Sequence, residues 1–305
     1  MISKKINNNL FRAFIEFYWL RPENAAVKYY QSHTWSDIKW KGKSIDICCG
    51  DGVYVFLHQG GRFNPNFDCF TNTNPNFSHE KKFIDIYDYS TVKYKPRILK
   101  KPKKTISLGT DWKNGMINKS KALSIYDKLL KYDNNKTPLP FKDNEFDFIH
   151  SNALYWTSNA PSLLKEAHRI LDNNSMAVLE FSTENLLSTI FQMKPILDKK
   201  AFDILDRQRS KEMKGIKYNT KDWISYIKKA GFIIEDIRVA WPNKYIVDFW
   251  NTGLRPYSHL LIDMANSINP RHRLKIKEEW VNIFYNILKP LCERPKGFKL
   301  KEASY

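Results

Sequence analysis

The chain has 305 residues, 42% hydrophobic and 14% aromatic, a composition typical of a packed globular protein rather than a disordered one. No apolar run approaches the ~20 residues that span a bilayer, and the opening MISKKIN lacks the apolar core of a secretory signal. We therefore expect a cytoplasmic protein. The four cysteines follow no zinc-binding pattern, so we expect neither a disulfide nor a bound metal.

The formal net charge of +18 leaves two interpretations open. A basic surface attracts anionic partners, including nucleic acid. Abundant lysine, asparagine and isoleucine would also follow from an A/T-rich genome, without any function. The densest basic run, residues 93–104, holds seven Lys or Arg, no acid and two prolines. We predict a loop there, either simply solvated or a docking patch for a phosphorylated, lipid-linked or nucleic-acid substrate.

Residues 1–39 are predicted to form a helical extension. Residues 10–20 are rich in aromatic and aliphatic side chains over a helical length, Arg21-Pro22 interrupts them, and residues 23–31 suit a second helix. The extension either packs permanently against the rest of the chain or acts as a lid that excludes water from a bound ligand.

A tight turn follows the first predicted strand. Ser44 to Ile47 run into Cys48, Cys49, Gly50, Asp51 and Gly52, and residues 53–58 then suit a helix. Glycines at alternate positions let a backbone turn sharply and approach a ligand closely. The helix amino end that follows favours anionic or polar ligand groups. The turn therefore predicts a nucleotide-like ligand at the end of a buried parallel strand.

Residues 59–105 are predicted to be an insertion. Gly52 and Asp111 lie 59 positions apart, whereas about 20 residues would suffice to return the chain to a neighbouring strand. The segment is rich in Gly, Asn and Pro but also in aromatic residues, which argues for order. We expect it to border the functional site or to form a homodimer contact.

The following elements repeat the pattern of a strand that ends in polar residues. Residues 106–111 form a strand that ends in Asp111, and an acid at this position of a nucleotide-binding fold holds ribose hydroxyls. Asp133-Asn134 and the sequence Leu139-Pro140-Phe141 come next. Residues 145–152 then form a strand, residues 163–171 a helix with a 3.6-residue apolar period, and residues 176–181 another strand.

In this order, the motifs resemble those of the class I S-adenosylmethionine-dependent methyltransferases, in particular the small-molecule, type 11-like domain. The resemblance covers about residues 40–183, and Cys48 departs from it, because many members have glycine or alanine there. It implies S-adenosylmethionine as the cofactor. By position, it implies that the cofactor is bound by Asp46, Gly50, Asp51, Gly52, Asp111, Trp112, Asp133, Asn134, Ser151 and Asn152.

The resemblance also implies a Rossmann-like α/β fold with a seven-stranded, mostly parallel sheet and helices on both faces. Residues 40–305 would be one domain with insertions at 59–105 and 241–296. Helices are expected near 186–199 and 202–211, and from Thr220, which would cap a helix that ends at Gly231. Residues 232–239 are predicted as strand six and residues 297–303 as strand seven, after the mainly helical second insertion.

The functional prediction is methyl transfer to a small-molecule or glycan acceptor, most plausibly at oxygen. A hydroxyl nucleophile needs a base, for which the candidates are Tyr155 and His58; Trp156 and Arg255 are candidate substrate contacts. A protein or nucleic-acid methyltransferase is one alternative, although no N-P-P-Y-type motif follows strand four. A non-catalytic scaffold with this fold is another. A nicotinamide enzyme is disfavoured, because Val55 stands where its third glycine belongs.

Overall fold

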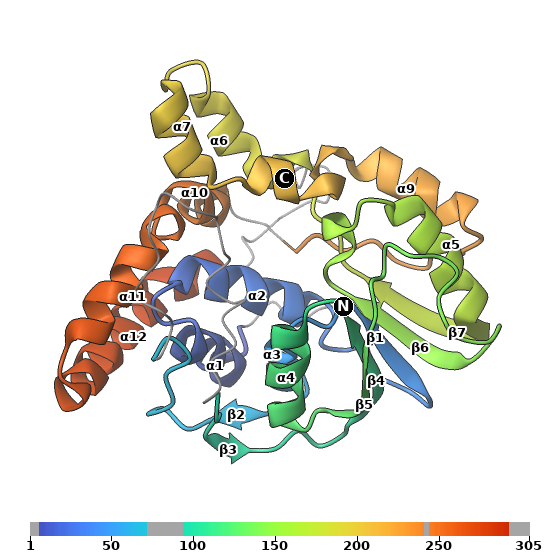
Figure 1. Cartoon of the computed structure of the whole chain (residues 1–305), viewed down its shortest axis with the longest axis horizontal. Coiled ribbons are helices and arrows are strands. Elements are labelled where there is room, and N and C mark those ends of the chain that lie inside the picture. The colour runs from blue at the N-terminus through green and yellow to red at the C-terminus, as the bar shows by residue number, and fades with distance from the viewer. Residues whose placement is uncertain (1–5, 72–93, 241–243, 293–305) are drawn as a thin grey trace.

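The computed structural model describes residues 6–71, 94–240 and 244–292, and its centre is a five-stranded parallel sheet (Figure 1). The strands lie in the order β5-β4-β1-β6-β7, with every neighbouring pair parallel. A separate antiparallel pair joins β2 to β3. The strands are β1 (Ser44–Ile47), β2 (Arg62–Phe63), β3 (Ile98–Lys100), β4 (Ile106–Asp111), β5 (Tyr126–Lys131), β6 (Phe146–Ser151) and β7 (Leu171–Leu179).

The strand order places a crevice beside β1. The chain moves from β1 outward through β4 to β5, then returns to the other side of β1 for β6 and β7. In open α/β sheets, ligands bind beyond the carboxyl ends of the strands at the point where this order reverses. The turn after β1 and the residues after β6 lie at that point.

Helices cover both faces of the sheet, with α3 and α4 on one side and α5 and α9 on the other (Figure 1). Asn159 caps the amino end of α5, and Asn219 forms a capping box with Asp222 at the start of α9. The helices before the C-terminal group are α1 (Asn8–Phe17), α2 (Pro22–Thr34), α3 (Val53–His58), α4 (Asn114–Leu123), η1 (Leu154–Trp156), α5 (Ala160–Ile170), η2 (Glu184–Leu187), α6 (Ser188–Met193), α7 (Lys199–Asp206), α8 (Arg209–Glu212), η3 (Lys214–Lys217) and α9 (Thr220–Lys229).

The N-terminal helices lie between the sheet and a C-terminal helical group (Figure 1). That group comprises α10 (Lys244–Thr252), η4 (Arg255–Tyr257), α11 (Ser258–Ser267) and α12 (Pro270–Cys292). Phe11 packs on Tyr285 with ring centroids 5.4 Å apart, and Trp19 packs edge-on against Trp280. The aromatic residues of the extension are therefore core residues shared between the two ends of the described chain.

Several predicted elements are corrected by the structure. Residues 232–239 form no strand, so the described residues contain five strands in the main sheet; the predicted strand seven, 297–303, lies outside them. The basic run includes β3 and is not all loop. β7 begins at Leu171, where we expected the end of a helix, and the cap of α9 is Asn219 rather than Thr220.

Candidate cofactor and active site

The turn after β1 is built from three residues with left-handed backbone conformations. Cys48 has φ of 61°, Gly50 of 58° and Gly52 of 73°. Glycine adopts such angles freely, whereas a residue with a Cβ does so at a cost of about 1–2 kcal/mol. Cys48 is thus strained at the position where the sequence departs from the methyltransferase pattern. The turn keeps its shape nonetheless, because β4 and α4 hold it.

Three hydrogen bonds fix this turn. The Cys49 amide donates to the Thr110 carbonyl at 2.8 Å, and the Gly50 amide donates to Asp111 Oδ2 at 3.1 Å. The Ser120 hydroxyl donates to the Gly50 carbonyl at 2.8 Å. Asp111 is buried, with 7% of its surface exposed, and its Oδ1 accepts from the Lys113 amide. The carboxylate predicted to hold ribose therefore lies directly against the glycine turn.

Open space lies in front of Gly50. A Cβ added there would meet no atom within 4 Å, whereas one at Gly52 would lie 3.0 Å from the Ser120 hydroxyl and 3.1 Å from the Tyr126 ring. Gly52 is therefore required for packing beneath the turn. Gly50 keeps the outer side of the turn open, because it has no side chain there. Open space in front of Gly50, beside a buried carboxylate, fits the methionine and ribose parts of S-adenosylmethionine.

The predicted adenine contacts differ in their accessibility. Trp112 is exposed over 59% of its surface and follows Asp111, the last residue of β4. Asp133 Oδ1 accepts from the backbone and side chain of Asn135. The Asn134 side chain is buried: its Oδ1 accepts from the Thr110 hydroxyl, and its Nδ2 contacts Cys48 Sγ at 3.3 Å. Only the backbone of Asn134 is left to approach a ligand.

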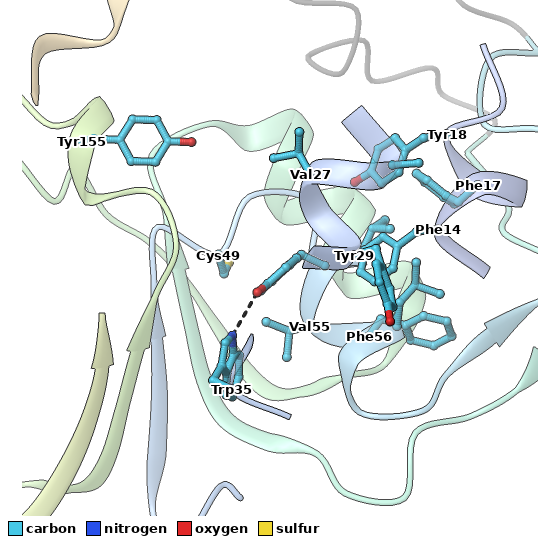
Figure 2. Close-up of a cluster of buried hydrophobic side chains, with 14 of the residues drawn as sticks. Phe14, Phe17, Tyr18, Val27, Tyr29, Trp35, Cys49, Val55, Phe56 and Tyr155 are labelled. Atoms are coloured by element: carbon cyan, nitrogen blue, oxygen red, sulfur yellow. Dashed lines mark hydrogen bonds between the residues drawn. The ribbon is translucent and has the colours of Figure 1, made fainter. Parts of the chain in front are cut away.

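The residues after β6 reach the same crevice. Ser151 is fully buried at the end of β6, and Asn152 follows it. Tyr155 lies on η1, is 7% exposed, and directs its phenol toward Val27 of α2 (Figure 2). The neighbouring Trp156 is 37% exposed, and the Arg209 guanidinium lies over its ring, 5.2 Å from the centroid. Tyr155 is therefore the better placed of the two to meet a bound acceptor.

Asp46 is buried, and both of its carboxylate oxygens contact side chains of the protein core. It is 1% exposed, its Oδ1 lies 2.7 Å from His150 Nδ1, and its Oδ2 accepts from the Tyr126 hydroxyl at 2.5 Å. Both oxygens are thus used, so Asp46 supports the strand beneath the turn and we do not retain it as a cofactor contact. This role was missed, because strand pairing had to be known before His150 could be placed opposite Asp46.

Glu180 joins Asp46 and His150 in one hydrogen-bond network, and it was not singled out in the sequence analysis. It follows β7, and its Oε1 accepts from the Tyr54 hydroxyl at 2.7 Å and from Trp35 Nε1 at 3.1 Å. His150 Nε2 lies 3.2 Å from the same oxygen. Burial by itself would lower the pKa of His150, but Asp46 and Glu180 outweigh it and raise the pKa to about 9. His150 is therefore an imidazolium shared by two carboxylates.

Two residues that were predicted to be functional, His58 and Arg255, are buried and make their contacts within the protein. His58 Nδ1 bonds to the Ser32 hydroxyl, its ring stacks on Trp35 at 3.7 Å, and burial lowers its pKa to about 3. Arg255 is 2% exposed and donates to the backbone carbonyls of Leu205, Asp206, Trp250 and Asn251. We therefore retain neither His58 as a base nor Arg255 as a substrate clamp. The described residues contain no cluster of three or more potential metal ligands.

The charged state of His150 makes stability depend on pH. Its pKa is about 9 in the folded chain and ~6.5 when unfolded. The charged His150 therefore stabilises the folded chain fully below pH 6.5, and this stabilisation declines as the pH rises toward 9. We expect the free energy of unfolding, measured in urea, to fall by roughly 1–2 kcal/mol between pH 6.5 and 8.5. His150→Gln should flatten this slope, and His168→Gln on α5 should leave it unchanged; an equal slope in all three proteins would contradict the assignment.

Residues 96–179, which contain β3 to β7, match the family model described as a methyltransferase domain. The matched segment holds Asp111, Asp133 and Ser151, and the strand order puts β1 between β4, which ends in Asp111, and β6, which ends in Ser151. No curated protein matches the sequence. No helix among the described residues has both the length and the apolar character needed to cross a membrane.

Solved structures with similarity to the chain are distant in sequence. A possible histamine N-methyltransferase from Thermotoga maritima is 15% identical with a TM-score of 0.44, over 74% of this chain and 81% of its own. A putative methyltransferase from Bacillus halodurans is 14% identical with a TM-score of 0.40, over 75% and 80%. The [4+2]-cyclase SpnF is 12% identical with a TM-score of 0.42, over 88% and 77%.

Proposed function

We propose that the chain is a class I S-adenosylmethionine-dependent methyltransferase and that it transfers a methyl group to a hydroxyl oxygen of a small-molecule or glycan acceptor. The observation that carries the proposal is the left-handed turn with free space at Gly50 and the buried carboxylate of Asp111 against it. These features occur where the strand order reverses, which is where this architecture binds its ligands.

The residues fall into groups along the cofactor. Gly50, Asp51 and Gly52 would bind the methionine part, and Asp111 the ribose hydroxyls. Trp112, Asp133 and the backbone of Asn134 would surround the adenine, and Ser151 with Asn152 the sulfonium side. When bound, S-adenosylmethionine supplies an electrophilic methyl group, so the protein's task is chiefly to bind and align.

The acceptor side would be formed by η1 and the N-terminal helices. Tyr155 projects from η1 toward Val27 of α2, so a molecule between them would lie against the phenol (Figure 2). A hydroxyl acceptor has to lose its proton during attack, and we propose that the Tyr155 phenol relays it, taking up this proton as it passes its own to water. Trp156 would border the same space, and α1 and α2 would act as the cover that excludes water.

Cofactor binding is the direct test of this function. We expect S-adenosylmethionine and S-adenosylhomocysteine to bind the wild type in calorimetry, and Asp111→Asn to weaken both at least about tenfold, since charge-assisted hydrogen bonds contribute ~1.5–3 kcal/mol. Asp127→Asn is the matched control, because Asp127 is an exposed carboxylate on the neighbouring β5.

Each outcome decides a separate part of the proposal. A folded wild type that binds neither compound would remove the enzymatic interpretation and favour a scaffold. Binding that Asp111→Asn leaves intact would place the cofactor elsewhere. With binding established, radiolabelled methyl transfer to sugars and phosphorylated metabolites tests the acceptor class. Transfer to RNA or protein instead would contradict the small-molecule assignment.

A further inference from the structure

A cavity lies between α2, the end of β7 and α9, and no residue of the glycine turn lines it. Its volume is about 290 Å³, at the lower end of the ~300–1,000 Å³ that ligand pockets occupy. Most of the lining is apolar or aromatic, including Trp35, Trp223, Ile224 and Ile227. Such walls suit a compact molecule with a substantial apolar body.

Three side chains that line this cavity have a buried polar atom without a hydrogen-bond partner. They are Gln31 Oε1, Glu180 Oε2 and Ser182 Oγ. Gln31 is 4% exposed and Ser182 is 5% exposed, so bulk water does not satisfy them. Buried polar atoms are nearly always paired, and three unpaired ones around a single cavity point to a ligand. Two of the three can only accept, so the ligand should donate.

The charges around Glu180 favour a cationic donor. Glu180 and Asp46 share one imidazole, that of His150, which leaves one negative charge of the cluster without a cation. The nearby Lys28 lies over the ring of Tyr54 rather than at the carboxylate. Among the described lining residues, Arg238 is the one Arg or Lys, and it already pairs with Asp37 and Asp236.

We propose that this cavity binds a compact, largely apolar molecule that carries a protonated amine. The amine would donate to Glu180 Oε2, Ser182 Oγ and Gln31 Oε1, and the indole rings of Trp35 and Trp223 would receive its apolar part. Arg238 fastens the segment 234–240 to α2 by donating to the Thr34 carbonyl at 2.9 Å and to Asp37. This contact closes one side of the cavity. The proposal does not depend on methyl transfer.

The test is calorimetric titration of the full chain, without cofactor, with 2-phenylethylamine and with its neutral analogue 2-phenylethanol. We expect saturable binding of one amine per chain, at least about tenfold tighter than the alcohol. Glu180→Gln should weaken amine binding about tenfold or more. Glu184→Gln, the same change at an exposed residue four positions later, should alter it less than about twofold.

A second variant keeps the test valid if Glu180→Gln fails to fold. Ser182→Ala removes an unpaired polar atom, so the chain should remain folded while its amine affinity falls about threefold. Absence of saturable amine binding by folded wild type, or equal affinity for the alcohol, would overturn the proposal. S-adenosylmethionine titrated into the same preparations separates this result from failure of the cofactor site.

Discussion

Gly50→Val is expected to abolish detectable cofactor binding, with an affinity loss of at least about 100-fold, while the chain stays folded. The reason is that a side chain at Gly50 meets no protein atom within 4 Å and instead extends into the space that we assign to the methionine part of the cofactor. Folded stability should fall only by the strain of φ 58° at a β-branched residue, about 1–2 kcal/mol. Calorimetry with S-adenosylhomocysteine and urea unfolding measure the two effects.

Gly60 provides the matched control for this substitution. It also has a left-handed backbone, with φ of 86°, and an added Cβ also meets nothing within 4 Å, but it follows α3 rather than the turn. Gly60→Val should therefore reproduce the loss of stability without changing cofactor affinity. Equal affinity losses in both variants, or none in Gly50→Val, would show that the space at Gly50 is not the cofactor site.

Asp46→Ala should lower the free energy of unfolding by about 3–5 kcal/mol, the largest change in stability that we expect from a single substitution. It removes a carboxylate that is 1% exposed and leaves His150 Nδ1 and the Tyr126 hydroxyl without their acceptor inside the core. Each buried donor left without an acceptor costs about 1–3 kcal/mol, and a charged donor costs more. Equilibrium unfolding in urea at pH 6.5 measures the change.

Asp127→Ala is the control for the loss of a carboxylate from the sheet. Asp127 is exposed on β5, so its replacement should change stability by no more than about 0.5 kcal/mol. A loss below ~1 kcal/mol in Asp46→Ala would mean that His150 is neutral in the folded chain. The pH dependence described above should then disappear as well.

The central strands could be predicted from the sequence because their patterns are local. Residues 106–111 and 146–151 each begin with an apolar residue, hold further apolar residues and end in polar ones, and both are strands beside β1. β5 was not singled out, because three of its six residues are charged and it lies at the sheet edge, where charges discourage aggregation. Residues 232–239 are rich in apolar and β-branched residues, but they pair with no strand among the described residues.

In the candidate site, too, the residues that local sequence patterns could identify differ from those that depend on strand pairing. Gly50, Gly52 and Asp111 follow from strand ends, so their proximity could be expected from the order of the motifs along the chain. The roles of Asp46, His150 and Glu180 could not, because they come from three different strands or strand ends and meet only through the sheet register. His58 was misjudged because α2 and the residue that follows it, remote in sequence, supply Ser32 and Trp35.

The packing of α1 against α12 has a consequence for synthesis of the chain. Phe11 and Trp19 find Tyr285 and Trp280 only after more than 260 further residues have been added. At ~5–20 residues per second, the aromatic face of α1 waits roughly 15–50 s on the ribosome for that partner. A nascent chain therefore presents this face to chaperones first, and ribosome-bound chains truncated before residue 270 should retain trigger-factor or Hsp70-type binding that the finished protein loses.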